Sequence, residues 1–288
     1  MYDNAQDFLF DTPPGCFAVV RCLSCGLTYL CPRPAEDHLG DYYPPIYPAY
    51  NNHQAPLIYK LYHLLAPIPY RLSHGSEKGT LKPFGQRRML DVGCGAGGYL
   101  YDMQRLGWNV YGVDVSDIAV DVARARIGSP QVYVGTIESL EQSLDKFDLI
   151  TMNHSLEHMA YPNSTLHAVY QRLTGNGMLK VTVPDVSGFE ARVFGRYWVG
   201  LDVPRHLVDF SKRTLIAVLQ ENGFHIESWR PQFFPYIVYG SFDVLLKHKL
   251  HIRWRLLRYA LDAPIVGLAL LSYSLGNRGA IEVIARKQ

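Results

Sequence analysis

The sequence has few features of a membrane, secreted or nucleic-acid-binding protein. Charged residues make up only 19% of the chain and the formal net charge is +2, so no basic excess points to a nucleic-acid partner. The amino terminus lacks the basic and then apolar order of a secretory signal, and the apolar run at 264–271 is too short to span a bilayer. We therefore expect a cytoplasmic protein with no nucleic-acid ligand.

Internal repeats and low-complexity tracts are also missing. The hydrophobic fraction of 48% is typical of a globular chain. A length of 288 residues allows one large domain with appendages, or two small domains. We favour one main core.

The cysteines form only half of a familiar metal site. Four of the five lie between Cys16 and Cys31, and Cys22 and Cys25 form a Cys-x-x-Cys pair followed by Gly26. A zinc ribbon needs a second pair upstream, and that pair is absent. The spacing of the outer two cysteines is not a standard zinc pattern, so we predict thiols without a metal. A zinc site completed by Cys16 and Cys31 is the alternative.

The clearest motif has the order strand, tight turn, helix. An apolar run ends in Asp91 and is followed by Gly93, Gly95 and Gly98, a spacing that lets the backbone approach a ligand. The same glycines satisfy G-x-G-x-x-G, which alone is a weak indication of a dinucleotide. The carboxylate of Asp91 instead favours a ligand with ammonium and sulfonium charges. Asp114 ends the next apolar run, where it can accept the hydroxyls of a ribose.

At these residues the chain resembles the class I S-adenosylmethionine-dependent methyltransferases. Their first motif is acidic-x-Gly-x-Gly, and their second strand ends in an acidic residue. The resemblance implies S-adenosylmethionine as cofactor, bound by residues at the strand ends: Asp91, Gly93, Gly95, Asp114, Val115, Thr136, Ile137 and Asn153. A nucleotide-binding oxidoreductase on the same kind of sheet and a catalytically idle binding module are the alternatives.

Apolar runs alternate with amphipathic stretches between residues 87 and 229, as in a parallel sheet covered on both faces. The resemblance implies a Rossmann-like α/β fold, in which a seven-stranded, mostly parallel sheet with an antiparallel last strand lies between helices. After the first strand we predict strands at 108–113, 131–134, 147–152, 178–183, 224–229 and 280–285, and helices at 98–106, 117–125, 137–143, 165–173 and 214–221.

Two appendages flank this fold. We assign residues 1–82 to an N-terminal half-ribbon and cap, and 83–288 to the S-adenosylmethionine-binding domain with a helical insertion at 233–279. Aromatic residues of the cap are expected to close over the ligand or to pack on the sheet. The insertion is basic and amphipathic, which favours helices that pack on the domain, with contact to a membrane surface or an anionic lipid-linked substrate as the alternative. Its basic residues are Lys247, Lys249, Arg253, Arg255 and Arg258.

Two other segments carry the same resemblance. Cys22–Leu27 resembles the lead-in of many bacterial small-molecule methyltransferases, and Leu201–Leu207 (Leu-Asp-Val-Pro-Arg-His-Leu) matches a segment after their fifth strand. Polar and aromatic residues gather there, as in a substrate loop, so we expect Trp198, Asp202 and Arg205 at the substrate. A loop held down by Trp198 and a salt bridge of Arg205 is the alternative.

The predicted reaction is methyl transfer to an oxygen of a sugar, glycan, lipid or secondary metabolite. An alcohol must lose a proton around the transfer step, and histidine is the side chain best suited to accept it near neutral pH. We rank His158 and His206 equal as the base and His154 third, and we expect no catalytic metal. The sequence leaves the oligomeric state open.

Overall fold

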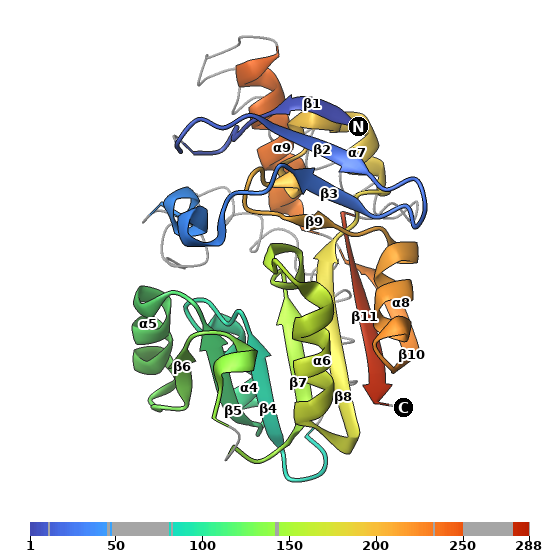
Figure 1. Cartoon of the computed structure of the whole chain (residues 1–288). Helices are drawn as coiled ribbons and strands as arrows, with labels where there is room; N and C mark the ends of the chain where they lie inside the picture. Colours follow the sequence, from blue (N-terminus) through green and yellow to red (C-terminus); the bar gives the residue numbers. More distant parts are fainter. Residues whose placement is uncertain are drawn as a thin grey trace.

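The structure is a computed structural model that describes residues 1–10, 12–44, 47, 81, 83–141, 144–232, 234–249 and 279–287. It contains a seven-stranded sheet and a smaller four-stranded sheet (Figure 1). Residues 48–80, which belong to the predicted cap, lie outside the described residues. So do the basic residues of the insertion after position 249, namely Arg253, Arg255 and Arg258. The division at residue 82 and the membrane contact stay predictions.

The large sheet has the predicted topology. Its strands are β4 (Arg88–Val92), β5 (Asn109–Asp114), β6 (Val132–Val134), β7 (Phe147–Asn153), β8 (Leu173–Pro184), β10 (Phe224–Gln232) and β11 (Ala280–Lys287). They are ordered β10-β11-β8-β7-β4-β5-β6. Strands β4 to β8 pair in parallel, whereas β11 runs antiparallel to both β8 and β10. The mostly parallel sheet with an antiparallel last strand is therefore confirmed.

Helices cover both faces of this sheet because its strands are apolar on both faces. In β4, Met89 packs with Met103 and Ala123 on one face, and Leu90 packs with Leu166 and other residues on the opposite face. The helices are α4 (Gly98–Arg105), α5 (Asp117–Ile127), α6 (Pro162–Arg172), α7 (Phe189–Phe194), α8 (Lys212–Glu221) and α9 (Pro235–His248).

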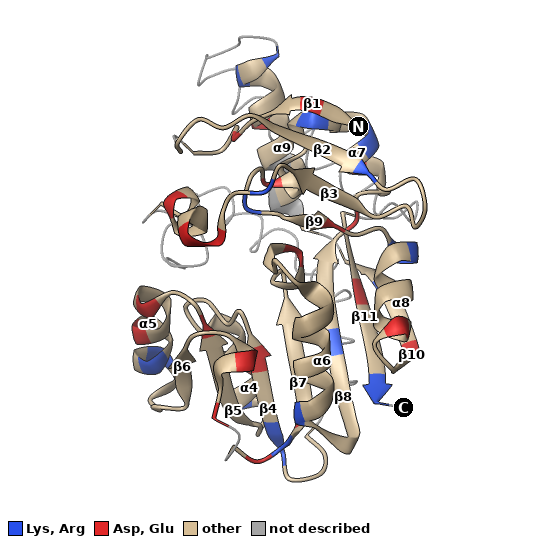
Figure 2. Cartoon of the chain, viewed as in Figure 1, with Lys and Arg blue, Asp and Glu red and all other residues tan. Residues whose placement is uncertain are grey.

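Short 3-10 helices connect these elements: η1 (Glu36–Tyr42), η2 (Ile137–Ser139), η3 (Leu156–His158), η4 (Gly195–Tyr197) and η5 (Val199–Leu201). The helix predicted at 137–143 is only the single turn η2, because Leu140 is already extended. Within the described chain, no helix is long and apolar enough to cross a membrane. Acidic and basic residues are interspersed over the elements seen in Figure 2.

The small sheet joins segments that are far apart in the sequence. Its order is β1-β2-β3-β9, with strands β1 (Tyr2–Ala5), β2 (Phe17–Arg21), β3 (Thr28–Cys31) and β9 (Val208–Asp209). Strand β9 comes from the segment that follows the predicted substrate loop, and it pairs antiparallel with β3. The N-terminal strands therefore lie beyond the carboxyl ends of β7 and β8 (Figure 1).

Candidate active site

A cavity of about 1000 Å³ opens at the carboxyl ends of the parallel strands. The ends of β4, β5 and β7 contribute Val92, Asp114 and Asn153 to its wall, and the glycine turn, residues of the N-terminal segment and the start of α9 supply much of the rest. Open α/β sheets bind ligands at this edge. The volume is at the upper end of the range for small-molecule sites, which leaves room for two ligands.

The glycine turn between β4 and α4 forms one wall of the cavity. Gly93 and Gly97 have φ values of +73° and +71°, which side chains other than glycine rarely adopt. A Cβ atom on Gly93 would lie 2.5 Å from the Cβ of Ser155, and one on Gly97 would lie 2.8 Å from that of Ala123. Glycine is therefore required at both positions by the backbone angle and by close packing within the protein, and Gly93 also lines the cavity.

Asp114, at the end of β5, stabilises this turn and also faces the cavity. Its Oδ2 accepts a hydrogen bond from the Gly95 backbone at 2.8 Å, and its Oδ1 accepts one from the Ser116 backbone at 3.0 Å. Each carboxylate oxygen has a second lone pair for a ligand hydroxyl. The neighbouring Val115 also lines the cavity, and 71% of its surface is exposed. The pair offers a polar and an apolar contact side by side.

Asp91 lies beneath the turn and is not among the cavity-lining residues. Only 2% of its surface is exposed, and its Oδ1 accepts hydrogen bonds from Thr151 Oγ1 at 2.6 Å and Asn153 Nδ2 at 3.2 Å. Burial raises the pKa of Asp91 to about 7, although these donors and the charge of Lys180 oppose the shift. Asn153 does line the cavity, so it connects Asp91 to that space.

Thr136 and Ile137 line the cavity beyond β6. The Thr136 backbone donates to Ser139 Oγ at 3.0 Å, which begins the η2 turn. Ile137 is buried, so its side chain forms a fixed apolar surface at this end. Of the eight cofactor-binding residues predicted from the sequence, all but Asp91 line this one cavity.

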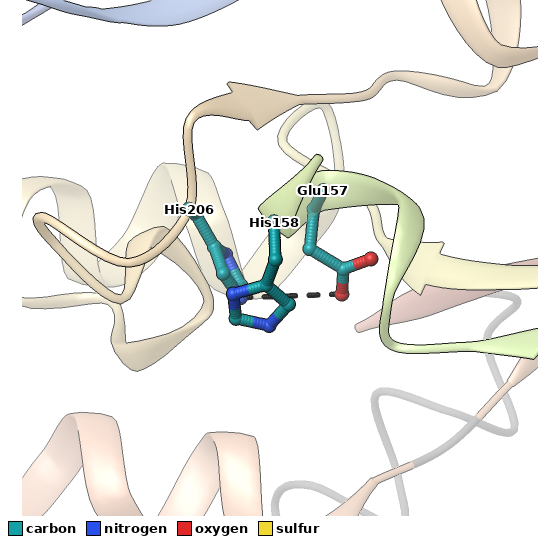
Figure 3. A group of neighbouring side chains, drawn as sticks. All are labelled: Glu157, His158 and His206. Carbon is teal, nitrogen blue, oxygen red and sulfur yellow. Dashed lines mark ion pairs between the residues drawn. The ribbon is translucent and has the colours of Figure 1, made fainter. Parts of the chain in front are cut away.

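The histidines of η3 and the predicted substrate loop meet at the same cavity (Figure 3). The rings of His158 and His206 lie edge to face with centroids 4.6 Å apart. His206 Nδ1 donates to the Gly200 carbonyl at 2.8 Å. Three carboxylates surround the same imidazole: Glu157 Oε1 and Asp202 Oδ2 lie 3.9 and 4.0 Å from Nε2, and Asp209 Oδ1 lies 3.8 Å from Nδ1.

The two histidines differ in protonation. Burial alone would lower the pKa of His206, but the three carboxylates outweigh burial and raise it to about 9. Burial and the positive charge of His206 together lower the pKa of His158 to about 4, although nearby carboxylates oppose this. At neutral pH, His206 is therefore an imidazolium and His158 a neutral imidazole.

The tautomer of His158 follows from its neighbours. Its Nδ1 lies 3.0 Å from the Arg205 carbonyl oxygen and 3.0 Å from the Tyr43 hydroxyl oxygen. A carbonyl can only accept, so Nδ1 carries the hydrogen and Nε2 keeps its lone pair. His154 also lines the cavity, but its Nδ1 is 3.4 Å from Glu157 Oε1 and its ring packs against Phe234.

The three predicted substrate residues occupy different places. Asp202 lines the cavity, whereas Trp198 and Arg205 do not. Trp198 is 2% exposed and belongs to the hydrophobic core beneath the loop. Arg205 is fully buried between Asp7 and Asp202, each with a carboxylate oxygen 2.6 Å from the guanidinium. Direct contact of Trp198 or Arg205 with a substrate stays a prediction.

Comparison with known proteins identifies the family. A model of the methyltransferase domain matches residues 52–228, more than half of the chain. The chain belongs to this methyltransferase family. It is an S-adenosylmethionine-dependent methyltransferase, and the predicted class and cofactor are confirmed.

Named relatives and solved structures agree with this assignment. The chain is 33% identical over 171 residues to a ubiquinone biosynthesis O-methyltransferase of Bartonella tribocorum, in a match that covers 53% of this chain and 69% of the relative. A mitochondrial enzyme of the same name from Schizosaccharomyces pombe is 32% identical over 102 residues, but the match covers only 33% of this chain and 37% of that protein. An S-adenosylmethionine-dependent methyltransferase of Thermotoga maritima has the same fold, with 20% identity, a TM-score of 0.51 and coverage of 80% of this chain and 94% of that one.

The methyltransferase has a site that fits its cofactor. Gly93, Gly95 and Gly98 line the cavity without side chains, and Asp114 presents acceptor oxygens beside them. These are the features that a nucleoside ligand requires at the edge of such a sheet. His158 and His206 line the same cavity and contribute neither of these features.

Several functional residues could not be recognised in the sequence. Phe10 and Leu9 line the cavity although nothing in their local pattern indicates a ligand. Asp209 lies three residues after His206, and its Oδ1 is 3.8 Å from the imidazole Nδ1, a contact that the sequence analysis did not consider. The aromatic character of the cap was the one usable signal, since Tyr43 and Tyr47 line the cavity.

The cluster also has donor atoms at metal-ligand spacing. Among the described residues, only Glu157, His158 and His206 bring three candidate ligand atoms together, all within 4.8 Å of one another. The pair Cys22 and Cys25 lies in the turn between β2 and β3, far from this arrangement in the chain and with Cys25 exposed.

Proposed function

We propose that this methyltransferase methylates a hydroxyl oxygen of an apolar, aromatic small molecule. The observation that carries the proposal is the wall supplied by the N-terminal segment, the residues around η3 and α9. Two polar residues, Glu36 and Ser155, line it beside the histidine cluster, and the other side chains are mainly apolar or aromatic: Leu9, Phe10, Leu39, Tyr43, Tyr47, Met159, Phe234 and Ile237. A sugar or glycan would need many hydrogen-bonding side chains there.

The relatives support an oxygen acceptor, because the Bartonella tribocorum protein is named an O-methyltransferase. They support it only in part, since that match covers about half of this chain. Of the acceptors expected from the sequence, an apolar metabolite or lipid therefore fits this cavity better than a sugar.

Each group of cofactor-binding residues is assigned to one part of S-adenosylmethionine. We assign the ribose hydroxyls to Asp114, the adenine edge to Thr136 and Ile137, and the methionine end to the glycine turn with Asn153 and Asp91 behind it. Bound S-adenosylmethionine supplies an electrophilic methyl group, whose transfer depends mainly on alignment of the acceptor with it. The chain contributes a rigid edge of strand ends for that alignment.

We assign the proton acceptor to His158. Its Nδ1 is held by the Arg205 carbonyl, so the lone pair of Nε2 is available, and its ring lines the cavity. His206 is already protonated at neutral pH and cannot accept another proton. Its positive charge would instead stabilise the oxygen as the hydroxyl ionises. His154 is engaged with Glu157 and serves position rather than proton transfer.

Two experiments test this function. Calorimetry should show tight binding of S-adenosylhomocysteine and none of NAD. Transfer of labelled methyl from S-adenosylmethionine should then be measured with catechols, with and without an alkyl chain, and with hexoses and primary amines. We expect methyl ethers of the catechols. Methylation of only hexoses or amines would refute the proposed acceptor.

A further inference from the structure

Arg205 is buried completely, which is unusual for a guanidinium. Its Nη1 donates to Asp7 Oδ2 at 2.6 Å and to the Tyr42 carbonyl at 2.9 Å. Its Nε and Nη2 donate to Asp202 Oδ1 at 3.0 and 2.6 Å. The side chain therefore bonds two carboxylates at once, one from the N-terminal segment and one from its own loop.

The same N-terminal segment, by which we mean the described residues up to Tyr47, reaches the part of the cavity that the histidine cluster lines. The Tyr43 hydroxyl lies 3.0 Å from His158 Nδ1, and the Tyr47 hydroxyl donates to Asp202 Oδ2 at 3.1 Å. Phe10 lies in the cavity wall, and its ring centre is 4.8 Å from the Arg205 guanidinium carbon. One network thus connects the segment to the histidine cluster.

The segment is attached to the loop at 202–209 through backbone pairing and through a polar side-chain network, which Tyr47 also joins. The backbone of β3 pairs with β9 at Thr28 and Asp209. The second attachment is the ion-pair network of Asp7, Arg205 and Asp202. Several residues that line the cavity contact this network or adjoin residues that do: Tyr47 donates to Asp202, Phe10 packs on Arg205, and Tyr43 follows Tyr42, whose carbonyl accepts from Arg205. If only the backbone pairing of β3 with β9 held the segment, these residues would be free to adopt more positions.

We propose that the N-terminal segment is the acceptor-recognition element of this enzyme, and that Asp7, through Arg205, is the positioning residue that seats it over the histidine cluster. Donor binding needs neither residue, because the glycine turn and Asp114 belong to the large sheet. The inference rests on the proposed function for the chemistry of the acceptor, but the seating of the segment does not depend on it.

The test compares Asp7→Asn with Asp3→Asn in the full chain. Asp3 lies exposed on β1, in the same segment, and provides a matched loss of charge. Hydrogen exchange followed by mass spectrometry reports the opening of residues 2–10 and 36–43. Loss of one partner of a buried ion pair should raise exchange there by at least about tenfold in Asp7→Asn. Asp3→Asn should match the wild type.

Two further measurements separate seating from general stability. The affinity for S-adenosylhomocysteine should stay within about twofold of wild type in Asp7→Asn, and exchange in β4, β5 and β7 should not change. With catechol as the probe acceptor, KM should rise at least about tenfold, while kcat falls less. Asp7→Glu keeps the charge, so its KM should lie between those of the wild type and Asp7→Asn.

Each contrary result has a distinct meaning. Unchanged exchange of the N-terminal segment in Asp7→Asn would overturn the seating. Raised exchange with an unchanged KM would overturn the role in recognition. An equal rise of exchange in the large sheet, with weaker S-adenosylhomocysteine binding, would make Asp7 a general stability residue. If the wild type does not methylate catechols at all, the proposed function fails, while the exchange data still decide the seating.

Discussion

Replacement of His206 by asparagine should reveal an imidazolium inside the folded protein. The asparagine amide can still donate to the Gly200 carbonyl, as His206 Nδ1 does at 2.8 Å, but it cannot carry a charge. The pKa of His206 rises from 6.5 to about 9 on folding, because Asp209, Asp202 and Glu157 outweigh the effect of burial.

The magnitude follows from linkage between protonation and folding. A raised pKa stabilises the folded state fully below the unfolded value of 6.5, and the contribution is lost as the pH rises through about 9. Each pKa unit corresponds to about 1.4 kcal/mol, so the charged imidazole contributes about 3 kcal/mol at pH 6 and almost nothing above about pH 9.5. The His206→Asn variant should therefore lose about 3 kcal/mol more stability at the lower pH.

Urea unfolding of wild type and variant at both pH values measures this difference. Titrating groups far from His206 change both proteins alike and cancel, whereas His158 and the three carboxylates are coupled to His206 and belong to the measured difference. His225, which is exposed on β10, gives the matched control His225→Asn, in which the same substitution is made outside the histidine cluster. A cost of His206→Asn that is equal at the two pH values, within about 0.5 kcal/mol, would show that His206 is neutral in the folded protein and would refute the reasoning.

Three other changes test the remaining assignments. Asp114→Ala should weaken S-adenosylhomocysteine binding by about 1–3 kcal/mol in calorimetry, because a ribose hydroxyl and the Gly95 amide lose their acceptor; unaltered affinity would contradict the ribose assignment. Gly93→Ala should destabilise the turn by about 1–3 kcal/mol in urea unfolding, since its backbone has a φ of +73°. His158→Gln should reduce kcat by about 10²–10⁴ with little change in donor affinity, and full turnover would exclude His158 as the base.

The residues assigned to S-adenosylmethionine were predictable because their arrangement depends on local sequence. A glycine turn after an apolar strand requires particular backbone angles, so Gly93 and Gly95 mark its position within the sequence itself. The order of strands places Asp114 and Asn153 at the same edge, since parallel strands end together. The helix at 137–143 was predicted too long, because a capping turn at Thr136 looks like a helix start whether or not a helix follows.

The acceptor half was decided by tertiary structure. In the sequence, His158 and His206 are equivalent candidates for the base, and only the fold surrounds one of them with three carboxylates. Arg205 is predicted from the sequence to lie at the substrate, and only the fold shows that its guanidinium is bound by Asp7, nearly two hundred positions away. Asp202 and Asp209 are close to His206 in the sequence, but Glu157 is distant, and the fold is needed to bring all three carboxylates around one imidazole. The sequence by itself therefore determined the fold and the cofactor, whereas the packing of the N-terminal segment decided which polar groups remain free for the acceptor.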